Sequence, residues 1–324
     1  MSELTRMLVD AAERIFRAAS PVLEGTYDVT TWQLLEHAGI DRLLLPEELG
    51  GVGDDFEAVI QVARCFGMHS CFIPLIETLV ANRWLREAGL EVGPGPKTIA
   101  LPLGSRAVTW AADNIAVVCG DGSTLSVGEA CTGAIRSNLA GEPVRYLTPE
   151  RAQRCNSTAR PGAVALYLTL KSAAIVGTLQ TALDMTVRYV NERTQFGRRI
   201  GSFQAIQHML ARMAEETAAA TAAVQLAGRR LGTPNELYFA AVAKSRVAEA
   251  ATSVAAMAHQ CHGAIGYTRE HPLHRFTNRA LAWRDDGGSE DYWNEQIGRA
   301  ALGTPDRLWD FVLNGAPIEY AAQG

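Results

Sequence analysis

Hydrophobic residues recur every three to four positions through most of the chain, which is the spacing of one face of an α-helix. This pattern predicts helices over residues 2–18, 31–38, 56–65, 76–88, 163–192, 203–231, 234–263, 289–301 and 305–313. The three longest ranges are rich in alanine and other small residues, which allow helices to pack closely. We therefore expect a mainly α protein that ends in a four-helix-type bundle.

Between residues 97 and 150 the pattern changes to short stretches of β-branched residues bounded by turn residues, which is typical of strands. These stretches read KTIALPL, AVTWAA, NIAVVCG, STLSVG and PVRYLT. The predicted organisation is an N-terminal helical domain over residues 1–95, a reduced β domain over 96–155 and a C-terminal helical bundle over 156–324.

Composition narrows the class of protein. The chain has 324 residues, of which 48% are hydrophobic and 20% charged, so it can bury a large core. A net charge of −5 gives no general attraction to nucleic acid or to an anionic membrane, and we expect neither as a partner. We find no apolar run of the ~18 residues that span a bilayer and no apolar signal-peptide region at the N-terminus, so we expect a cytoplasmic protein. The six cysteines form no CxxC pair and are expected to be reduced thiols.

A charged, glycine-interrupted segment, NERTQFGRRIGSFQAIQ, joins two of the long helical patterns at residues 191–207. It combines the guanidinium of Arg193, the aromatic ring of Phe196, a turn at Gly197 and the amide of Gln204. The planar donor fork of a guanidinium matches phosphate oxygens, and an amide can both donate to and accept from a nucleotide edge. These residue types alone leave two interpretations open, a diphosphate contact or a corner between helices with solvated charges.

The same segment resembles the acyl-CoA dehydrogenase family, whose pattern reads ER-x-x-FG-x-x-I-x-x-FQ-x-x-Q. The chain matches it in order and spacing with Glu192, Arg193, Phe196, Gly197, Ile200, Phe203, Gln204 and Gln207. A second segment, AHQCHGAIGYTREHPLHRFTNRA at residues 258–280, resembles the family pattern Q-x-x-GG-x-GY-x-x-E-x-P-x-x-R-x-x-RDA. In this chain Ala264 stands at the second glycine, and Asn278 and Arg279 stand at the Arg-Asp pair. Residues 32–53 also resemble the N-terminal helical domain of the family.

In the family, these two segments of one subunit bind the adenosine diphosphate half of FAD held by the neighbouring subunit. The resemblance therefore implies FAD as cofactor and an acyl-CoA as substrate. The implied FAD contacts are Arg193, Gln195, Phe196, Ile200, Phe203, Gln204, Gln260, Gly263, Ala264 and Ser289. Read from the residues alone, Gly263 and Gly266 end a long helix and allow close approach of a ligand, or Gly263 is simply a helix cap.

The implied reaction is α,β-dehydrogenation of an acyl-CoA thioester, in which a carboxylate takes the α proton. The family places this carboxylate at one of two positions, which are Gly287 and Tyr167 in this chain. Neither residue can act as the base, so no catalytic residue is assigned. Asp286 is a weak candidate for a displaced base, with Asp285 and Glu290 behind it.

The predicted β domain is also reduced, because residues 97–150 lack the T-E-P-x-x-GS and W-x-x-NG elements that contact the flavin ring and the substrate in the family. Together with the missing base, this resembles the short, degenerate subunits of α2β2 acyl-CoA dehydrogenases, which actinobacteria use on steroid side chains. A longer catalytic partner subunit is then implied. Two alternatives stay open: a self-sufficient dehydrogenase that uses Asp286, and a flavin-free scaffold of the same fold.

Two further clusters receive no role in chemistry. Four histidines at positions 259, 262, 271 and 274 lack metal-ligand spacing, and we predict no metal site. Trp283, Tyr292 and Trp293 are expected to be core or interface residues, and Glu270 is expected to be a structural acid.

Overall fold

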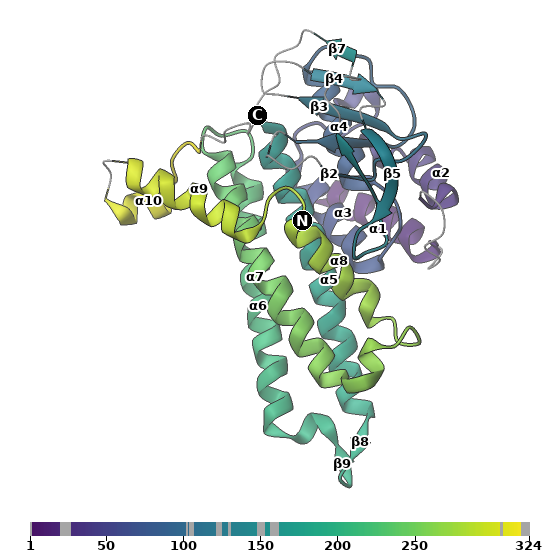
Figure 1. Cartoon of the computed structure of the whole chain (residues 1–324), viewed down its shortest axis with the longest axis vertical. Helices are drawn as coiled ribbons and strands as arrows, with labels where there is room; N and C mark the ends of the chain where they lie inside the picture. Colours follow the sequence, from purple (N-terminus) through teal and green to yellow (C-terminus); the bar gives the residue numbers. More distant parts are fainter. Residues whose placement is uncertain are drawn as a thin grey trace.

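The fold is mainly helical, as predicted, and we analyse it in a computed structural model that describes residues 2–19, 27–101, 103, 107–120, 125–128, 131–147, 153–155, 162–304 and 307–318. The N-terminal helices and the strands lie together at one end, and long helices extend from them (Figure 1). The α-helices are α1 (Glu3–Ala18), α2 (Val29–His37), α3 (Phe56–His69), α4 (Leu75–Glu87), α5 (Gly162–Glu192), α6 (Gln204–Arg230), α7 (Glu236–His262), α8 (Leu273–Asp285), α9 (Glu290–Gly303) and α10 (Leu308–Asn314).

The C-terminal bundle is built around α5, which packs against α6, α7 and α8. With 31 residues, α5 is long and apolar enough to cross a membrane, so our expectation that no segment would meet that test was wrong. Its most apolar window is 94% buried against the rest of the fold, and its hydrophobicity is used for packing.

Two helix-interior glycines join the N-terminal helices to the bundle. A Cβ atom at Gly67 of α3 would lie 1.9 Å from the carbonyl oxygen of Ala174, and one at Gly177 of α5 would lie 2.1 Å from that of Arg64. Only glycine permits this close approach of the two helix backbones. The position of α5 relative to α3 is therefore set by backbone contact.

The strands form two small sheets and one hairpin. One sheet has the order β1 (Lys97–Ala100), β3 (Ala116–Gly120), β4 (Leu125–Gly128) and β7 (Gln153–Cys155), and the other has the order β2 (Ala107–Thr109), β6 (Pro143–Leu147) and β5 (Cys131–Ser137). The pair β1–β3 is parallel, with Lys97 opposite Ala116, and the other pairs are antiparallel. The hairpin β8 (Thr194–Gln195) and β9 (Arg198–Arg199) lies at the far end of the bundle (Figure 1).

Several elements differ from the sequence-based prediction, which included neither strand β5 nor strand β7. Helix α8 was not predicted, because its segment LHRFTNRALAWRD mixes charged and apolar residues and follows a proline. The hairpin was predicted only as a glycine turn, because two-residue strands carry no periodic signal. The predicted domain limits stay a prediction, and residues 156–161 at one of them lie outside the described residues.

Candidate functional site

Tyr167 and Gly287, the two positions at which the resemblance implies a base, line one cavity of about 240 Å³ beneath the sheets. Tyr167 reaches it from α5, and Gly287 from the loop between α8 and α9. Gly287 has a φ of +76°, and a Cβ atom there would lie 3.0 Å from Cε1 of Tyr167. The tyrosine ring therefore occupies the space into which a side chain at position 287 would extend.

Buried charged groups close the floor of this cavity. Lys171, one turn along α5 from Tyr167, forms an ion pair with Glu77 of α4, and the two side chains are 1% and 3% exposed. The Nζ atom of Lys171 is also 3.3 Å from Oδ2 of Asp286. The same Oδ2 atom accepts a hydrogen bond of 2.8 Å from the Tyr167 hydroxyl. The weak base candidate Asp286 thus lines the cavity with one oxygen held by two donors.

The buried charges in this floor determine the protonation states of Tyr167 and Lys171. Burial, reinforced by the carboxylates of Asp286 and Glu77, raises the pKa of Tyr167 well above its ordinary value. Burial alone would lower the pKa of Lys171, but the carboxylates of Glu77 and Asp286 raise it above its ordinary value. Tyr167 therefore stays a hydrogen-bond donor and Lys171 a cation at neutral pH, and neither can accept a proton.

A second layer of polar contacts holds the loop that carries Asp286 and Gly287. The indole Nε1 of Trp283 donates to both oxygens of the buried Glu142, at 2.9 and 3.1 Å. Lys244 of α7, which is fully buried, donates from Nζ to the Trp283 carbonyl oxygen at 2.7 Å. The indole of Trp293 donates to the Gly287 carbonyl oxygen at 2.9 Å. Trp283 and Trp293 are 1% and 0% exposed, which confirms their prediction as core residues.

The sequence analysis missed Glu77, Lys171, Glu142 and Lys244, because no motif contains them. One signal was available: Lys171 is a lone charge inside the apolar run ALYLTLKSAAIVG. A charge placed in the core stretch of a helix needs a buried partner.

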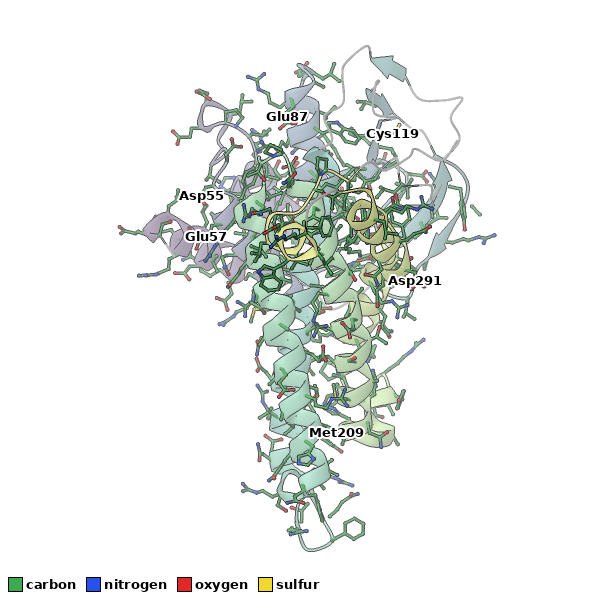
Figure 2. The ribbon with its side chains drawn as sticks, turned by 90° about the vertical axis from the view of Figure 1, so that its left-hand side faces the viewer. Asp55, Glu57, Glu87, Cys119, Met209 and Asp291 are labelled. Carbon is green, nitrogen blue, oxygen red and sulfur yellow. The ribbon has the colours of Figure 1, made fainter. Side chains whose placement is uncertain are left out.

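The implied FAD contacts gather on a different surface, at the hairpin end of the bundle. Ile200 packs with Val190 and Cys261 in a small buried cluster, which brings the segments 191–207 and 258–280 together. Phe196, at the hairpin tip with a φ of +51°, is 90% exposed. Figure 2 shows Met209 of α6 near this end of the bundle.

Polar groups on this surface are available to a ligand. The side chains of Arg193, Gln204 and Gln260 are exposed, and no hydrogen bond or ion pair of theirs is found within the described residues. Gly263 ends α7 with a φ of +64°, and Ala264 beside it is exposed. A free guanidinium, two free amides and a glycine turn together fit the adenosine diphosphate part of a dinucleotide.

The remaining implied contacts are Phe203, Gln195 and Ser289, and they do not form one cluster. Phe203 carries the guanidinium of Arg198 over its ring, 4.1 Å from the centroid. Gln195 is exposed in β8. Ser289 lies far from the hairpin, where its Oγ accepts from the amide of Tyr292 and caps α9.

We call the surface that carries Arg193, Gln204 and Gln260 the hairpin surface. It is widely separated from the cavity lined by Tyr167 and Gly287. Tyr167 and Arg193 are 26 positions apart and are joined by the continuous helix α5. At ~1.5 Å per residue, they lie about 39 Å apart along the helix axis. One subunit therefore presents two distinct surfaces.

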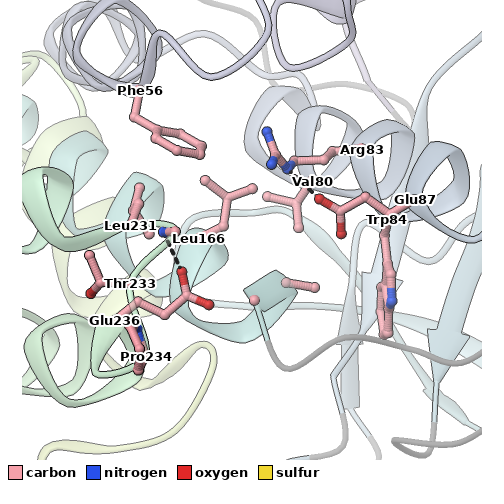
Figure 3. A pocket seen from close by; sticks show the side chains of 13 residues that line it. Phe56, Val80, Arg83, Trp84, Glu87, Leu166, Leu231, Thr233, Pro234 and Glu236 are labelled. Atoms are coloured by element: carbon pink, nitrogen blue, oxygen red, sulfur yellow. Dashed lines mark hydrogen bonds and ion pairs between the residues drawn. The ribbon is translucent and has the colours of Figure 1, made fainter.

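A further cavity, of about 420 Å³, lies between α3, α4, α5 and the loop from α6 to α7 (Figure 3). Its charged side chains already have partners. Arg83 contacts Glu87 at 2.8 Å and Asp54 at 2.6 Å, and Glu236 accepts from the Gly232 amide at 2.7 Å. Arg83, Glu87 and Glu236 of this cavity are therefore engaged in contacts of their own.

Comparison with known proteins identifies the family. The model of the acyl-CoA dehydrogenase C-terminal domain matches residues 169–302. The chain is 33% identical over 264 residues to acyl-CoA dehydrogenase IpdE2 of Mycobacterium tuberculosis, covering 78% of this chain and 81% of that protein. The chain therefore belongs to the acyl-CoA dehydrogenase family, whose enzymes are oxidoreductases that act on acyl-CoA.

Solved structures share the fold. One chain of the Tcur3481-Tcur3483 steroid acyl-CoA dehydrogenase variant G363A aligns with a TM-score of 0.80 at 23% identity, covering 92% of this chain and 97% of that one. One chain of the ChsE4-ChsE5 complex from Mycobacterium tuberculosis aligns with a TM-score of 0.79 at 22% identity, covering 94% of this chain and 99% of that one.

Proposed function

We propose that this chain is the non-catalytic subunit of an FAD-dependent, heteromeric acyl-CoA dehydrogenase. Its hairpin surface would bind the adenosine diphosphate half of an FAD whose flavin lies in a longer partner subunit. The partner would supply the carboxylate that removes the α proton. The observation that carries the proposal is the contrast between the two surfaces: exposed, unpaired polar groups at the hairpin end of the bundle, and a cavity in which Tyr167, Lys171 and Asp286 are engaged with one another.

The state of the cavity supports this division of labour. A catalytic base needs an unengaged carboxylate next to the substrate, poised to accept a proton. Here the two family positions hold Gly287 and the protonated Tyr167, and Lys171 with Glu77 fills the space beneath them. When bound, FAD supplies acceptance of the β hydride; this chain would hold and orient its diphosphate through Arg193.

The similar structures support a two-subunit assembly. Both are complexes of two different chains by their names, Tcur3481 with Tcur3483 and ChsE4 with ChsE5. The first is described as a steroid acyl-CoA dehydrogenase. We propose an α2β2 hetero-oligomer for this chain, with a steroid-type or other bulky acyl-CoA as the substrate of the assembly.

The test is expression of the chain alone and with a longer, glutamate-bearing homologue, followed by a flavin absorbance spectrum and a native mass. We expect flavin and dehydrogenase activity only in the co-expressed complex. Arg193→Ala should then reduce flavin retention without loss of assembly, while Arg229→Ala, at the opposite end of α6, should leave it unchanged.

The self-sufficient alternative rests on Asp286, which lines the cavity. It predicts a yellow, active homo-oligomer whose activity is lost in Asp286→Asn. Activity of the chain purified alone would overturn the proposed partner dependence. A chain that stays colourless in every complex would favour the flavin-free scaffold.

A further inference from the structure

A cavity of about 510 Å³ lies apart from both surfaces described above, between the start of α8, the turn from β5 to β6 and the end of α3. Its polar side chains come from Ser70, Arg269, His274, Arg275, Asn278 and Arg279. Every one of these can donate a hydrogen bond, and none of the lining residues is acidic. In a chain of net charge −5, a cavity bordered by three arginines is a local reversal of charge.

Arg279 forms the floor of this cavity and is only 1% exposed. Its Nε atom is 3.9 Å from Oε1 of Glu142, which is too far for a hydrogen bond. Its two terminal nitrogens have no hydrogen-bond partner among the described residues. Burying guanidinium donors without partners is costly, and such groups in native structures call for an unseen acceptor.

Glu142 does not supply that acceptor, because its oxygens are already taken. Trp283 donates to both of them, and Asn138 donates to Oε2 at 2.9 Å. Glu142 compensates one positive charge at most. Arg269 and Arg275 form no ion pair with the described residues, so about two guanidinium charges remain in excess around the cavity.

We propose that this cavity is a binding site for a phosphoryl dianion, with Arg275 and Arg269 as the accessible contacts and Arg279 as the buried one. A phosphomonoester carries a charge of about −1.5 to −2 at neutral pH, which matches the excess of two. Its oxygens accept bidentate hydrogen bonds from arginine, and Asn278 and Ser70 add neutral donors. A monocarboxylate would leave one cation uncompensated.

The position of Arg279 in the sequence agrees with this reading. The family pattern has aspartate here, and this chain has replaced an anion by a cation at a buried position. The volume is within the ~300–1,000 Å³ of small-molecule sites, so a nucleotide that bears the phosphoryl group fits as well as free phosphate. The inference does not rest on the function proposed above.

Isothermal titration of the purified protein, in a phosphate-free buffer, tests the site with inorganic phosphate, coenzyme A and 3′-dephospho-coenzyme A. We expect saturable binding of one phosphoryl ligand per chain that weakens as NaCl is added. Coenzyme A binding that is lost in the dephospho form would assign the 3′-phosphate. Binding of phosphate alone would assign the free anion.

Arg275→Gln and Arg269→Gln should each weaken binding by about tenfold, equivalent to ~1.4 kcal/mol. Arg86→Gln, an exposed arginine at the end of α4, is the matched control and should change affinity less than about twofold. Arg279→Met is not a suitable test variant, because it would remove the positive charge that faces the buried Glu142 carboxylate. Absence of saturable binding by both inorganic phosphate and coenzyme A, or equal loss in Arg86→Gln, overturns the proposal. So would binding that survives both cavity variants.

Discussion

At the residue scale, a network of buried charges surrounds positions 167 and 287, where the resemblance to the family implies a catalytic carboxylate. Lys171, Glu77, Asp286 and Tyr167 satisfy one another across two helices and a loop. A buried ion pair of this kind adds little net stability over an apolar pair, but breaking it leaves an uncompensated charge.

Lys171→Met should therefore destabilise the chain by about 3–5 kcal/mol, measured as the free energy of unfolding in urea. The double variant Lys171→Met, Glu77→Leu removes the stranded carboxylate as well and should recover much of that loss. A single variant that costs less than about 1 kcal/mol would show that the pair is not buried as a unit.

Gly287→Ala tests how tightly the Tyr167 ring fills the space beside position 287. The substitution combines a positive φ with a Cβ atom 3.0 Å from the Tyr167 ring. Gly50→Ala is a control for backbone strain alone, because its φ is +83° and no atom lies within 4 Å of its added Cβ. We expect Gly287→Ala to be less stable than Gly50→Ala by roughly 1–2 kcal/mol in thermal or urea unfolding. Equal costs would mean that Tyr167 moves aside freely.

Lys244 should give the chain a dependence of stability on alkaline pH. Burial lowers the pKa of Lys244 to about 7, whereas in the unfolded chain it is ~10.4. Between these values the unfolded state binds more protons, so this residue makes stability rise with pH, by at most ~1.4 kcal/mol per pH unit. The difference in unfolding free energy between wild type and Lys244→Met, measured from pH 7 to 9, should change with that sign. A difference independent of pH would contradict the shift.

At the element scale, the turn Gly263–Tyr267 is supported by stacked histidines. His259 stacks on Tyr267 with ring centroids 4.6 Å apart, and His262 stacks on Tyr189 at 4.5 Å. The ring centroid of His271 lies 4.6 Å from that of His262, and burial together with the charge of His274 lowers the pKa of His271. The turn that carries the implied nucleotide contacts therefore depends on neutral imidazole rings.

Acidification should loosen this turn. Burial lowers the pKa of His259, His262 and His271, and the neighbouring histidines lower it further. Because the unfolded chain then binds more protons below pH ~6.5, stability falls as the pH drops from 7 towards 5. Amide protection factors, which correct for the slower intrinsic exchange at lower pH, should fall first at residues 263–267, and His271→Gln should reduce the effect. A uniform fall in protection across α5, α6 and α7 would place the cause elsewhere.

The helices and strands differ in how well they could be predicted from the sequence. Long amphipathic or alanine-rich helices such as α5 and α7 were predicted within a few residues, because periodicity and terminal glycines such as Gly263 define them. Helix α8 was missed, since its apolar residues are few and its stability comes from tertiary contacts such as that of Trp283 with Phe66. The implied FAD contacts came from a local motif, and they stay a prediction. The Lys171 network did not, because its members meet only through the packing of α4, α5 and the loop before α9.

At the scale of the whole molecule, the C-terminal helices α9 and α10 project from the bundle (Figure 1). Apolar side chains on these helices are exposed: Leu302 is 92% exposed, Leu308 70% and Trp309 68%. Large exposed apolar residues such as the adjacent Leu308 and Trp309 are typical of surfaces that associate with other protein.

Replacing Leu308 and Trp309 together by serine should therefore lower the native mass of the assembled protein, measured by size-exclusion chromatography with light scattering. Leu49→Ser, at a residue 42% exposed in the N-terminal region, is the control and should leave the mass unchanged. An unchanged mass in the double variant would show that assembly uses other surfaces.

The engaged side chains around the cavity have a consequence for how such a chain can evolve. A glutamate introduced at position 287 would meet the Tyr167 ring, and removing that ring would release Asp286 from its hydroxyl donor. Opening the floor would then expose the Lys171–Glu77 pair, and replacing one member alone would strand the charge of the other. Single replacements in this pair are therefore expected to be less stable than either the wild type or the double replacement. Under the partner-dependent function proposed above, the buried pair would make dependence on another gene product easier to keep than to reverse.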